Sequence, residues 1–163
     1  MARTVYIITA STGSYNGDRA DLSGPAAKEL CEKAGYEVKG LDVLPDDKEM
    51  LMDSMEEIAD AGVADLLLTT GGTGFSPDDV TPEATMEAVE RPAPGIAEAI
   101  RANSMKYTDR ACLSRAAAGI RGKTLIVNLP GSPKAVREAL TFILPILGHG
   151  LDILSGEAKD CAR

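Results

Sequence analysis

Residues 69–85 (TTGGTGFSPDDVTPEAT) place residue types that bind anions beside a pair of carboxylates. Gly71, Gly72 and Gly74 follow an apolar strand predicted over 64–70, and Thr73 adds a hydroxyl donor. Glycines adopt positive φ without strain and let a ligand approach the backbone closely, so such a turn offers free N–H groups to a phosphate. We therefore predict a phosphate- or nucleotide-binding turn made of Thr70, Gly71, Gly72, Thr73 and Gly74.

The segment after this turn reads as the start of a helix. Thr81 is a good N-cap and Pro82 suits the first helical position. Standard nucleotide signatures are absent: there is no G-x-x-x-x-G-K-[ST], and Pro77 stands where the last glycine of a G-x-G-x-x-G would fall. A plain glycine-rich turn before a capped helix accounts for the pattern about as well as a nucleotide site does.

A second junction between strand and helix occurs at residues 123–134. The apolar run 123–128 predicts a buried strand, after which Gly131 permits a turn, Ser132 caps a helix and Lys134 offers a cation. Parallel strands end at the same edge of a sheet, where open α/β proteins bind ligands. The two helix starts therefore favour one shared site.

Asp46 is a further candidate, and two interpretations of it stay open. With Glu49 three residues later, Asp46 matches the N-cap of a capping box. Its carboxylate also suits a catalytic or metal-binding role near a phosphate. The local pattern alone favours the cap over the catalytic role.

Strand and helix patterns alternate along the whole chain, which predicts one α/β domain over residues 1–163, a three-layer sandwich with a mainly parallel sheet. The residues between the first strand and the first helix, 11–21, are expected to form a polar loop. The last helix is expected to break at Gly148-His149-Gly150. The remaining predicted elements are strands at 5–9, 36–44 and 116–120, and helices from Pro25, over 51–62, 82–90 and 94–103.

Composition narrows the class of protein. The net charge of −8, from 25 acidic and 17 basic side chains, disfavours non-specific binding of nucleic acid. We expect no membrane span and no signal peptide, and three widely spaced cysteines indicate a reduced, cytoplasmic protein rather than a disulfide scaffold. A single histidine, His149, makes a multi-histidine metal site or a Ser-His-Asp triad improbable.

Three motifs together resemble the MoaB/Mog family of molybdenum-cofactor biosynthesis proteins, the molybdopterin adenylyltransferases, which include the G domains of gephyrin. They are TTGGTGFSPDDVTPEAT at 69–85, LSRAAAGIRGKTLIVNLPGSPKAV at 113–136 and ILPILGHGLDIL at 143–154. The resemblance implies a homotrimer that adenylylates molybdopterin with Mg-ATP, releases pyrophosphate and passes its product to a molybdate-insertion enzyme.

The same resemblance implies roles for individual residues. Asp46, after Leu44-Pro45, and Asp79, before Val80-Thr81-Pro82, match the family's two functional aspartates, which would be catalytic and would organise Mg²⁺. The glycine turn would bind nucleotide phosphates. The residues expected to hold the pterin and the adenylate are Ser11, Gly131, Ser132 and Lys134.

The chain departs from the family pattern at two positions. Thr12 stands where many members carry the aspartate of a Ser-Asp pair, and Asp78 stands where many carry an arginine. An extra anion beside a polyphosphate weakens its binding unless Mg²⁺ offsets the charge. The departures leave a second hypothesis beside the adenylyltransferase: a molybdopterin-binding or scaffold protein without turnover.

Overall fold

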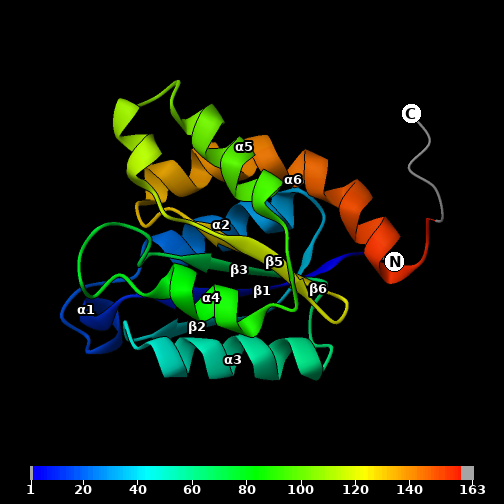
Figure 1. The fold of residues 1–163 in the computed structure, drawn as a ribbon, viewed down its shortest axis with the longest axis horizontal. Coiled ribbons are helices and arrows are strands. Elements are labelled where there is room, and N and C mark those ends of the chain that lie inside the picture. The colour runs from blue at the N-terminus through cyan, green and yellow to red at the C-terminus, as the bar shows by residue number, and fades with distance from the viewer. Residues whose placement is uncertain (1, 159–163) are drawn as a thin grey trace.

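A computed structural model describes residues 2–158. Its core is a six-stranded sheet in the order β2-β1-β3-β6-β5-β4 (Figure 1). The first four of these strands are parallel, and β5 and β4 close one edge in antiparallel pairs. The strands are β1 (Thr4–Ala10), β2 (Glu37–Leu44), β3 (Leu66–Thr70), β4 (Arg91–Pro92), β5 (Ala118–Arg121) and β6 (Thr124–Leu129).

Helices cover both faces of the sheet, which confirms the predicted three-layer α/β fold. In Figure 1, α2, α5 and α6 lie on one face, and α3 and α4 lie on the other. The helices are α1 (Thr12–Tyr15), α2 (Ser23–Lys33), α3 (Lys48–Asp60), α4 (Thr81–Ala88), α5 (Pro94–Ser104) and α6 (Pro133–Ser155), with a 3₁₀ helix, η1 (Asp109–Leu113).

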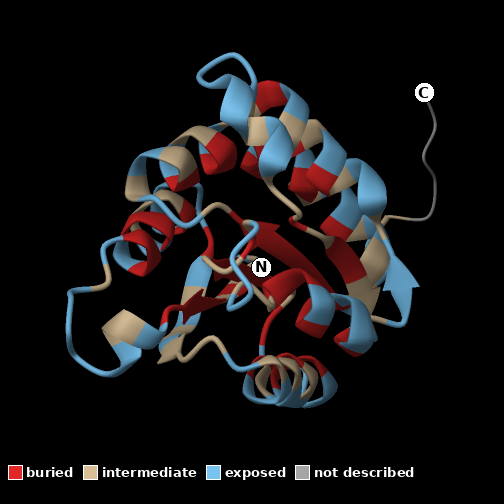
Figure 2. Cartoon of the chain, turned by 60° about the vertical axis from the view of Figure 1, so that its left-hand side comes forward, coloured by how far each residue is buried: buried red, intermediate tan, exposed pale blue. Residues whose placement is uncertain are grey.

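Alternation along β3 explains why its leucine run is continuous. Leu66 and Leu68 belong to the core under α2, α5 and α6, whereas Leu67 belongs to the core under α3 and α4. A strand covered on both faces favours a continuous apolar run over an alternating pattern. The central strands are accordingly the most deeply buried part of the chain (Figure 2).

Two predicted boundaries are wrong. The residues predicted as a polar loop contain the short helix α1, which Ser11 caps by accepting a hydrogen bond from the Ser14 amide. The last helix does not break at 148–150 but continues to Ser155. Burial of Leu147 and Leu151 in the core outweighs the cost of two glycines, about 1 kcal/mol each relative to alanine.

The continuous α6 also bears on the expectation that no segment of the chain is long and apolar enough to cross a membrane. It is the one helix of residues 2–158 that is long and apolar enough to cross a membrane. Its buried side chains, including Val136, Leu140 and Ile143, pack into the core with Leu66 and Val127. Here α6 is a core helix of the domain.

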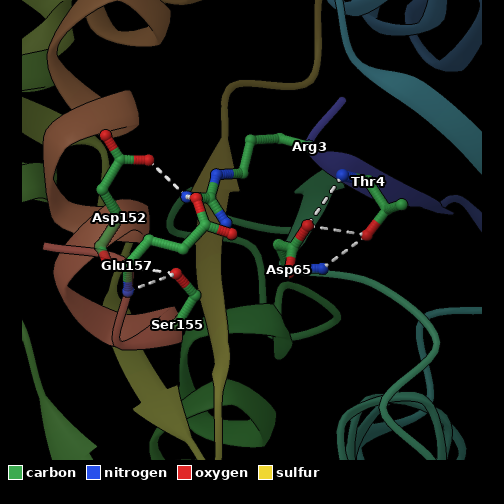
Figure 3. Close-up of polar contacts among 6 residues, drawn as sticks. All are labelled: Arg3, Thr4, Asp65, Asp152, Ser155 and Glu157. Atoms are coloured by element: carbon green, nitrogen blue, oxygen red, sulfur yellow. Dashed lines mark hydrogen bonds and ion pairs between the residues drawn. The ribbon is translucent and has the colours of Figure 1, made fainter. Parts of the chain in front are cut away.

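A polar cluster joins the start of β1 to the end of α6 (Figure 3). Arg3 forms ion pairs with Asp152 and Glu157 of the C-terminal end. Beside it, Asp65 accepts hydrogen bonds from the Thr4 amide at 2.8 Å and the Thr4 hydroxyl at 2.9 Å. These contacts connect segments that are far apart in the sequence.

Candidate active site

A cavity of about 470 Å³ lies where β1, β3 and β6 end at the carboxyl edge of the sheet. Its wall contains residues from the first loop, from the glycine turn and from the start of α6. Most of the residues predicted to form the site meet here: Ser11, Asp46, Thr70, Gly71, Gly72, Asp79, Gly131 and Ser132.

The glycine turn requires glycine at two positions. Gly71 has a φ of +93°, and a Cβ there would lie 2.4 Å from the Ala10 carbonyl oxygen. Gly72 has a φ of +69°, and a Cβ there would lie 2.4 Å from the Thr81 hydroxyl. The turn therefore packs directly against the end of β1 and the start of α4 without intervening side chains.

The Gly131 loop lies against this turn, so the two predicted helix starts share one site. A Cβ at Gly131 would be only 3.4 Å from the Gly71 Cα atom. The Thr70 hydroxyl donates to the Pro130 carbonyl at 2.7 Å. Ser132 caps α6 through its hydroxyl, which accepts from the Ala135 amide at 3.1 Å.

Asp46 does not cap α3, so the capping-box prediction is wrong. Asp47 takes that position, and its carboxylate accepts a hydrogen bond from the Met50 amide at 2.9 Å. Asp46 bonds Thr12 instead: its amide donates to the Thr12 hydroxyl at 2.9 Å, and its Oδ2 accepts from the Thr12 amide at 3.1 Å. This arrangement leaves Oδ1 on the side of Gly72.

Asp79 is anchored in a turn that its own side chain helps to form. Its Oδ2 accepts from the Ser76 amide at 3.0 Å, and its amide donates to the Ser76 carbonyl at 2.9 Å. A second cavity of about 470 Å³ lies at the glycine turn, where Thr73, Gly74 and Phe75 line it. Asp78 is exposed and lines neither cavity. The adjacent carboxylates thus have different surroundings.

Arg115 holds the glycine turn in place, a role that the sequence patterns did not predict. Its Nε donates to the Gly74 carbonyl at 2.8 Å, and its Nη2 donates to the Asp79 carbonyl at 2.7 Å. Its Nη1 pairs with Glu83 in the first turn of α4. One guanidinium therefore joins both ends of the 74–79 segment to α4.

The pKa of Glu83 reflects this pair. Burial raises the pKa of the carboxyl, but the Arg115 hydrogen bond, the Glu83 backbone amide and nearby positive charges lower it, so that the net pKa lies below its ordinary value.

The start of α4 also differs from the prediction. The helix begins at Thr81, whose amide donates to the Gly72 carbonyl at 3.1 Å, and the Thr81 hydroxyl caps nothing. Among residues 2–158 this buried hydroxyl finds no hydrogen-bond partner. The Gly72 carbonyl therefore accepts from the first amide of α4.

A buried network beneath the site fixes α4 to the sheet. The Asn128 side-chain amide donates to the hydroxyls of Thr69 at 2.9 Å and Thr85 at 2.8 Å. Thr85 donates in turn to the Thr81 carbonyl at 2.8 Å. All four residues are fully buried, so the network sets where the glycine turn ends and α4 begins.

Three predicted site residues lie outside the first cavity. The Lys134 side chain is 88% exposed and reaches toward Glu138 at 4.0 Å. Thr73 and Gly74 line the second cavity instead.

Arg19, by contrast, lines the first cavity, and its guanidinium donates to the Ser11 hydroxyl at 3.1 Å. Its position in the loop next to Ser11 was the only signal in the sequence.

The first cavity carries more negative than positive charge. Among the described residues of its wall, Arg19 is the one cation, against the carboxylates of Asp21, Asp46 and Asp79. Asp21 already accepts hydrogen bonds from the Ser23 and Gly24 amides at the start of α2 and from the Thr9 hydroxyl. A polyphosphate bound here needs a further cation.

The donor set fits Mg²⁺ shared with a substrate. Asp46 and Asp79 each use Oδ2 in the hydrogen bonds above, which leaves one carboxylate oxygen on each. Within residues 2–158 no group of three or more His, Cys, Asp or Glu side chains forms a metal cage. Mg²⁺ is commonly held by one or two carboxylates together with substrate phosphates.

The mostly parallel sheet, with a glycine turn and two carboxylates near its carboxyl edge, defines an α/β protein with a candidate phosphate site. Comparison with known proteins identifies the family. The family described as a probable molybdopterin binding domain matches residues 6–149, and the chain belongs to it. The predicted resemblance to MoaB/Mog proteins is confirmed.

Individual relatives agree with this assignment. Molybdopterin adenylyltransferase of Helicobacter pylori strain J99 is 38% identical over 154 residues, covering 92% of this chain and 86% of that protein. Gephyrin of Dictyostelium discoideum is 36% identical, but the chain spans only 23% of its length. The crystal structure of the molybdopterin biosynthesis enzyme MoaB from Thermus thermophilus is 43% identical, with a TM-score of 0.89 over 94% of this chain and 97% of that one.

Proposed function

We propose that this protein transfers an adenylyl group from Mg-ATP to molybdopterin, giving adenylyl-molybdopterin and pyrophosphate. The observation that carries the proposal is the meeting of Asp46 and Asp79 with the glycine turn and the start of α6 in one cavity. Relatives named molybdopterin adenylyltransferase, at 35–42% identity, support the same reaction.

This reaction requires the enzyme to position the two substrates' phosphates rather than to transfer a proton. A phosphate oxygen of molybdopterin forms a bond to the α-phosphorus of ATP, and the bond from that phosphorus to the bridging oxygen breaks as pyrophosphate leaves with the electron pair. Phosphate oxygens are already ionised near neutral pH, so neither aspartate is needed as a base. The enzyme must instead hold two anions together.

Each part of the site has a role in this reaction. Backbone N–H groups of Gly71 and Gly72 and the N-terminal end of α6 bind phosphate. Asp46 and Asp79 would hold Mg²⁺, which supplies positive charge to the phosphates when bound. Ser11 and Arg19 line the cavity on the side of the first loop, where they would contact a bound substrate.

The test is molybdopterin-dependent release of pyrophosphate from Mg-ATP. We expect release only when protein, molybdopterin and Mg²⁺ are all present. Folded protein that binds molybdopterin but releases no pyrophosphate would support the second hypothesis, a binding or scaffold protein. That alternative is motivated by Thr12 and Asp78, the two positions at which the chain departs from the family pattern. ATP consumption without molybdopterin would indicate a generic hydrolase.

The proposal extends to the oligomeric state of the protein, its compartment and the enzyme that uses its product. We infer a homotrimer acting in the cytoplasm, with a molybdate-insertion enzyme as the consumer of the adenylylated product. Light scattering at micromolar concentration tests the trimer, for which the expected mass is three times 17.1 kDa.

A further inference from the structure

One buried hydroxyl at the start of α4 lacks a hydrogen-bond partner. Fully buried threonines elsewhere in the chain donate to or accept from a neighbour, among them Thr69, Thr70, Thr85 and Thr124. Thr81 is the exception among residues 2–158, since it is 0% exposed and its hydroxyl bonds nothing. A hydroxyl buried in this way destabilises the folded chain, because it gives up its hydrogen bonds to water and gains none. Such groups are uncommon in folded proteins.

The backbone of Thr81 is held on both sides. Its amide donates to the Gly72 carbonyl at 3.1 Å, and its carbonyl accepts from the Thr85 hydroxyl at 2.8 Å. The Asn128 side chain holds Thr85 in turn. A shift of Thr81 toward a new partner would break these contacts, so a partner has to approach the hydroxyl instead.

The Thr81 hydroxyl lies beside Gly72, on the side that Asp46 also approaches. A Cβ at Gly72 would lie 2.4 Å from the Thr81 Oγ1 atom and 3.3 Å from the Asp46 Oδ1 atom. Thr81 itself lines neither cavity, whereas Gly72 lines both, so a bound substrate meets Gly72 and not this hydroxyl. The acceptor that shares the side of Gly72 with the hydroxyl is therefore a group of the protein, the Asp46 carboxylate.

Asp46 has one oxygen that is already held and one that can take this contact. Thr12 donates to Oδ2 through its amide at 3.1 Å and through its hydroxyl at 3.2 Å. Within residues 2–158 no hydrogen bond to Oδ1 is formed. A carboxylate oxygen has two lone pairs, so Oδ1 can bind a cation and accept a hydrogen bond at the same time. Hydrogen bonds of this kind fix the orientation of a carboxylate that binds a metal.

We propose that Thr81 is a positioning residue for the cation site: its hydroxyl donates to Asp46 Oδ1 when a divalent cation and a substrate phosphate occupy the first cavity. Thr12 then holds one oxygen of the carboxylate and Thr81 holds the other. This inference rests on the proposed function, which assigns the cation to Asp46 and Asp79. It gives the hydroxyl an acceptor in the state that binds the cation, and so accounts for its burial beside the site without a partner of its own.

The experiment measures the affinity of the folded protein for Mn²⁺, which takes the same oxygen ligands as Mg²⁺, by electron paramagnetic resonance with AMP present. We expect Thr81→Val and Thr81→Ala to weaken Mn²⁺ binding about tenfold, the lower end of the loss typical for groups that orient a metal ligand. Thr81→Ser keeps the hydroxyl and should bind Mn²⁺ within about twofold of the wild-type protein. Thr124→Val is the matched control, because the buried Thr124 hydroxyl donates to the Ala64 carbonyl at 2.8 Å at the first residue of β6, the end of the strand away from the site. It should leave Mn²⁺ affinity unchanged.

Urea unfolding without metal separates this role from a structural one. Thr124→Val removes a hydroxyl that has a partner and should lower the urea midpoint, whereas Thr81→Val removes a hydroxyl without one and should lower it less.

Three results would overturn the inference: unchanged Mn²⁺ affinity in folded Thr81→Val and Thr81→Ala proteins, an equal loss of affinity in Thr124→Val, or Mn²⁺ binding by Thr81→Ser as weak as that of Thr81→Ala. Failure of the proposed function has a different signature. Wild-type protein would then release no pyrophosphate, while Mn²⁺ binding would still respond to Thr81.

Discussion

Asp78 and Asp79 are neighbours in the sequence, but their carboxylates have different surroundings in the fold. Asp79 lines both cavities and accepts from Ser76, whereas Asp78 is exposed and lines neither. Asp46 is directed by Thr12, the residue at which this chain departs from the Ser-Asp pattern. At the residue scale, hydrogen-bond partners rather than residue types assign the functional acid.

We predict that Asp79→Asn lowers kcat about 100-fold or more while pterin binding changes little, since the amide keeps the shape but lacks the charge needed beside the phosphates. Asp78→Asn is the matched control. It should leave kcat nearly unchanged and lower the KM of ATP slightly, because it removes a nearby anion. Pyrophosphate release measures both variants, and equal rates for Asp79→Asn and wild-type protein would exclude the catalytic role.

At the scale of elements, α4 is held at each end by an arginine. Arg115 joins its first turn to the glycine turn through Glu83 and two carbonyls. Arg121 of β5 donates to the carbonyl of Ala88, the last residue of α4, at 2.9 Å and pairs with Asp60 of α3. The two contacts are chemically alike, but only the first touches the site.

We predict that Arg115→Ala lowers kcat about 100-fold, because Asp79 and the turn lose the contacts that position them. Arg121→Ala is the control, expected to keep kcat and KM within about twofold. Both pairs are partly exposed, so the loss of stability should be similar in the two variants, at most about 1 kcal/mol. Urea unfolding measures this loss, and Arg115→Lys should restore part of kcat. A parallel loss of kcat in both arginine variants would argue against a positioning role for Arg115.

The stability contributed by the pair between Arg115 and Glu83 is expected to depend on pH. The pKa of Glu83 is lower in the folded chain than its ordinary value of 4.5. The stability that the pair contributes is therefore present above about pH 4.5 and is lost as the pH falls through the lower, folded-state pKa. Arg115→Ala removes this part of the acid dependence of unfolding.

At the scale of the whole molecule, the two ends of the described chain are joined by side chains. Arg3 is only 16% exposed and pairs with Asp152 and Glu157, so β1 and the end of α6 form one unit (Figure 3). The hydrogen bond from Arg3 to Asp152 raises the pKa of the arginine, so the guanidinium stays charged throughout the accessible pH range.

We predict that Arg3→Ala lowers the melting temperature by about 2–4 °C, as expected for a loss of about 1 kcal/mol in a domain of this size. Lys39→Ala is the control. It removes an exposed pair with Glu37 inside β2 and should shift the melting temperature by less than about 1 °C. Calorimetry at low and high salt measures both. A shift in the Arg3 variant no larger than in the Lys39 variant would show that the cluster does not stabilise the fold.

Sequence patterns alone predict the α/β class, the parallel strands and the two glycine junctions. These features follow from local physics: the Leu66–Leu68 run needs two covered faces, and Gly71 with Gly131 permits sharp turns at the strand ends. Boundaries were less predictable, because burial of Leu147 and Leu151 overrode the glycines of α6.

Which side chains line the site depends on contacts between distant parts of the fold. Asp47 rather than Asp46 caps α3, Arg115 reaches Gly74 from 41 positions away, and Lys134 is exposed and does not line the cavity. Such contacts depend on where distant elements meet and on which oxygen or guanidinium is already occupied. Periodicity and spacing carry no information about those partners, so the polar details of the site required the fold.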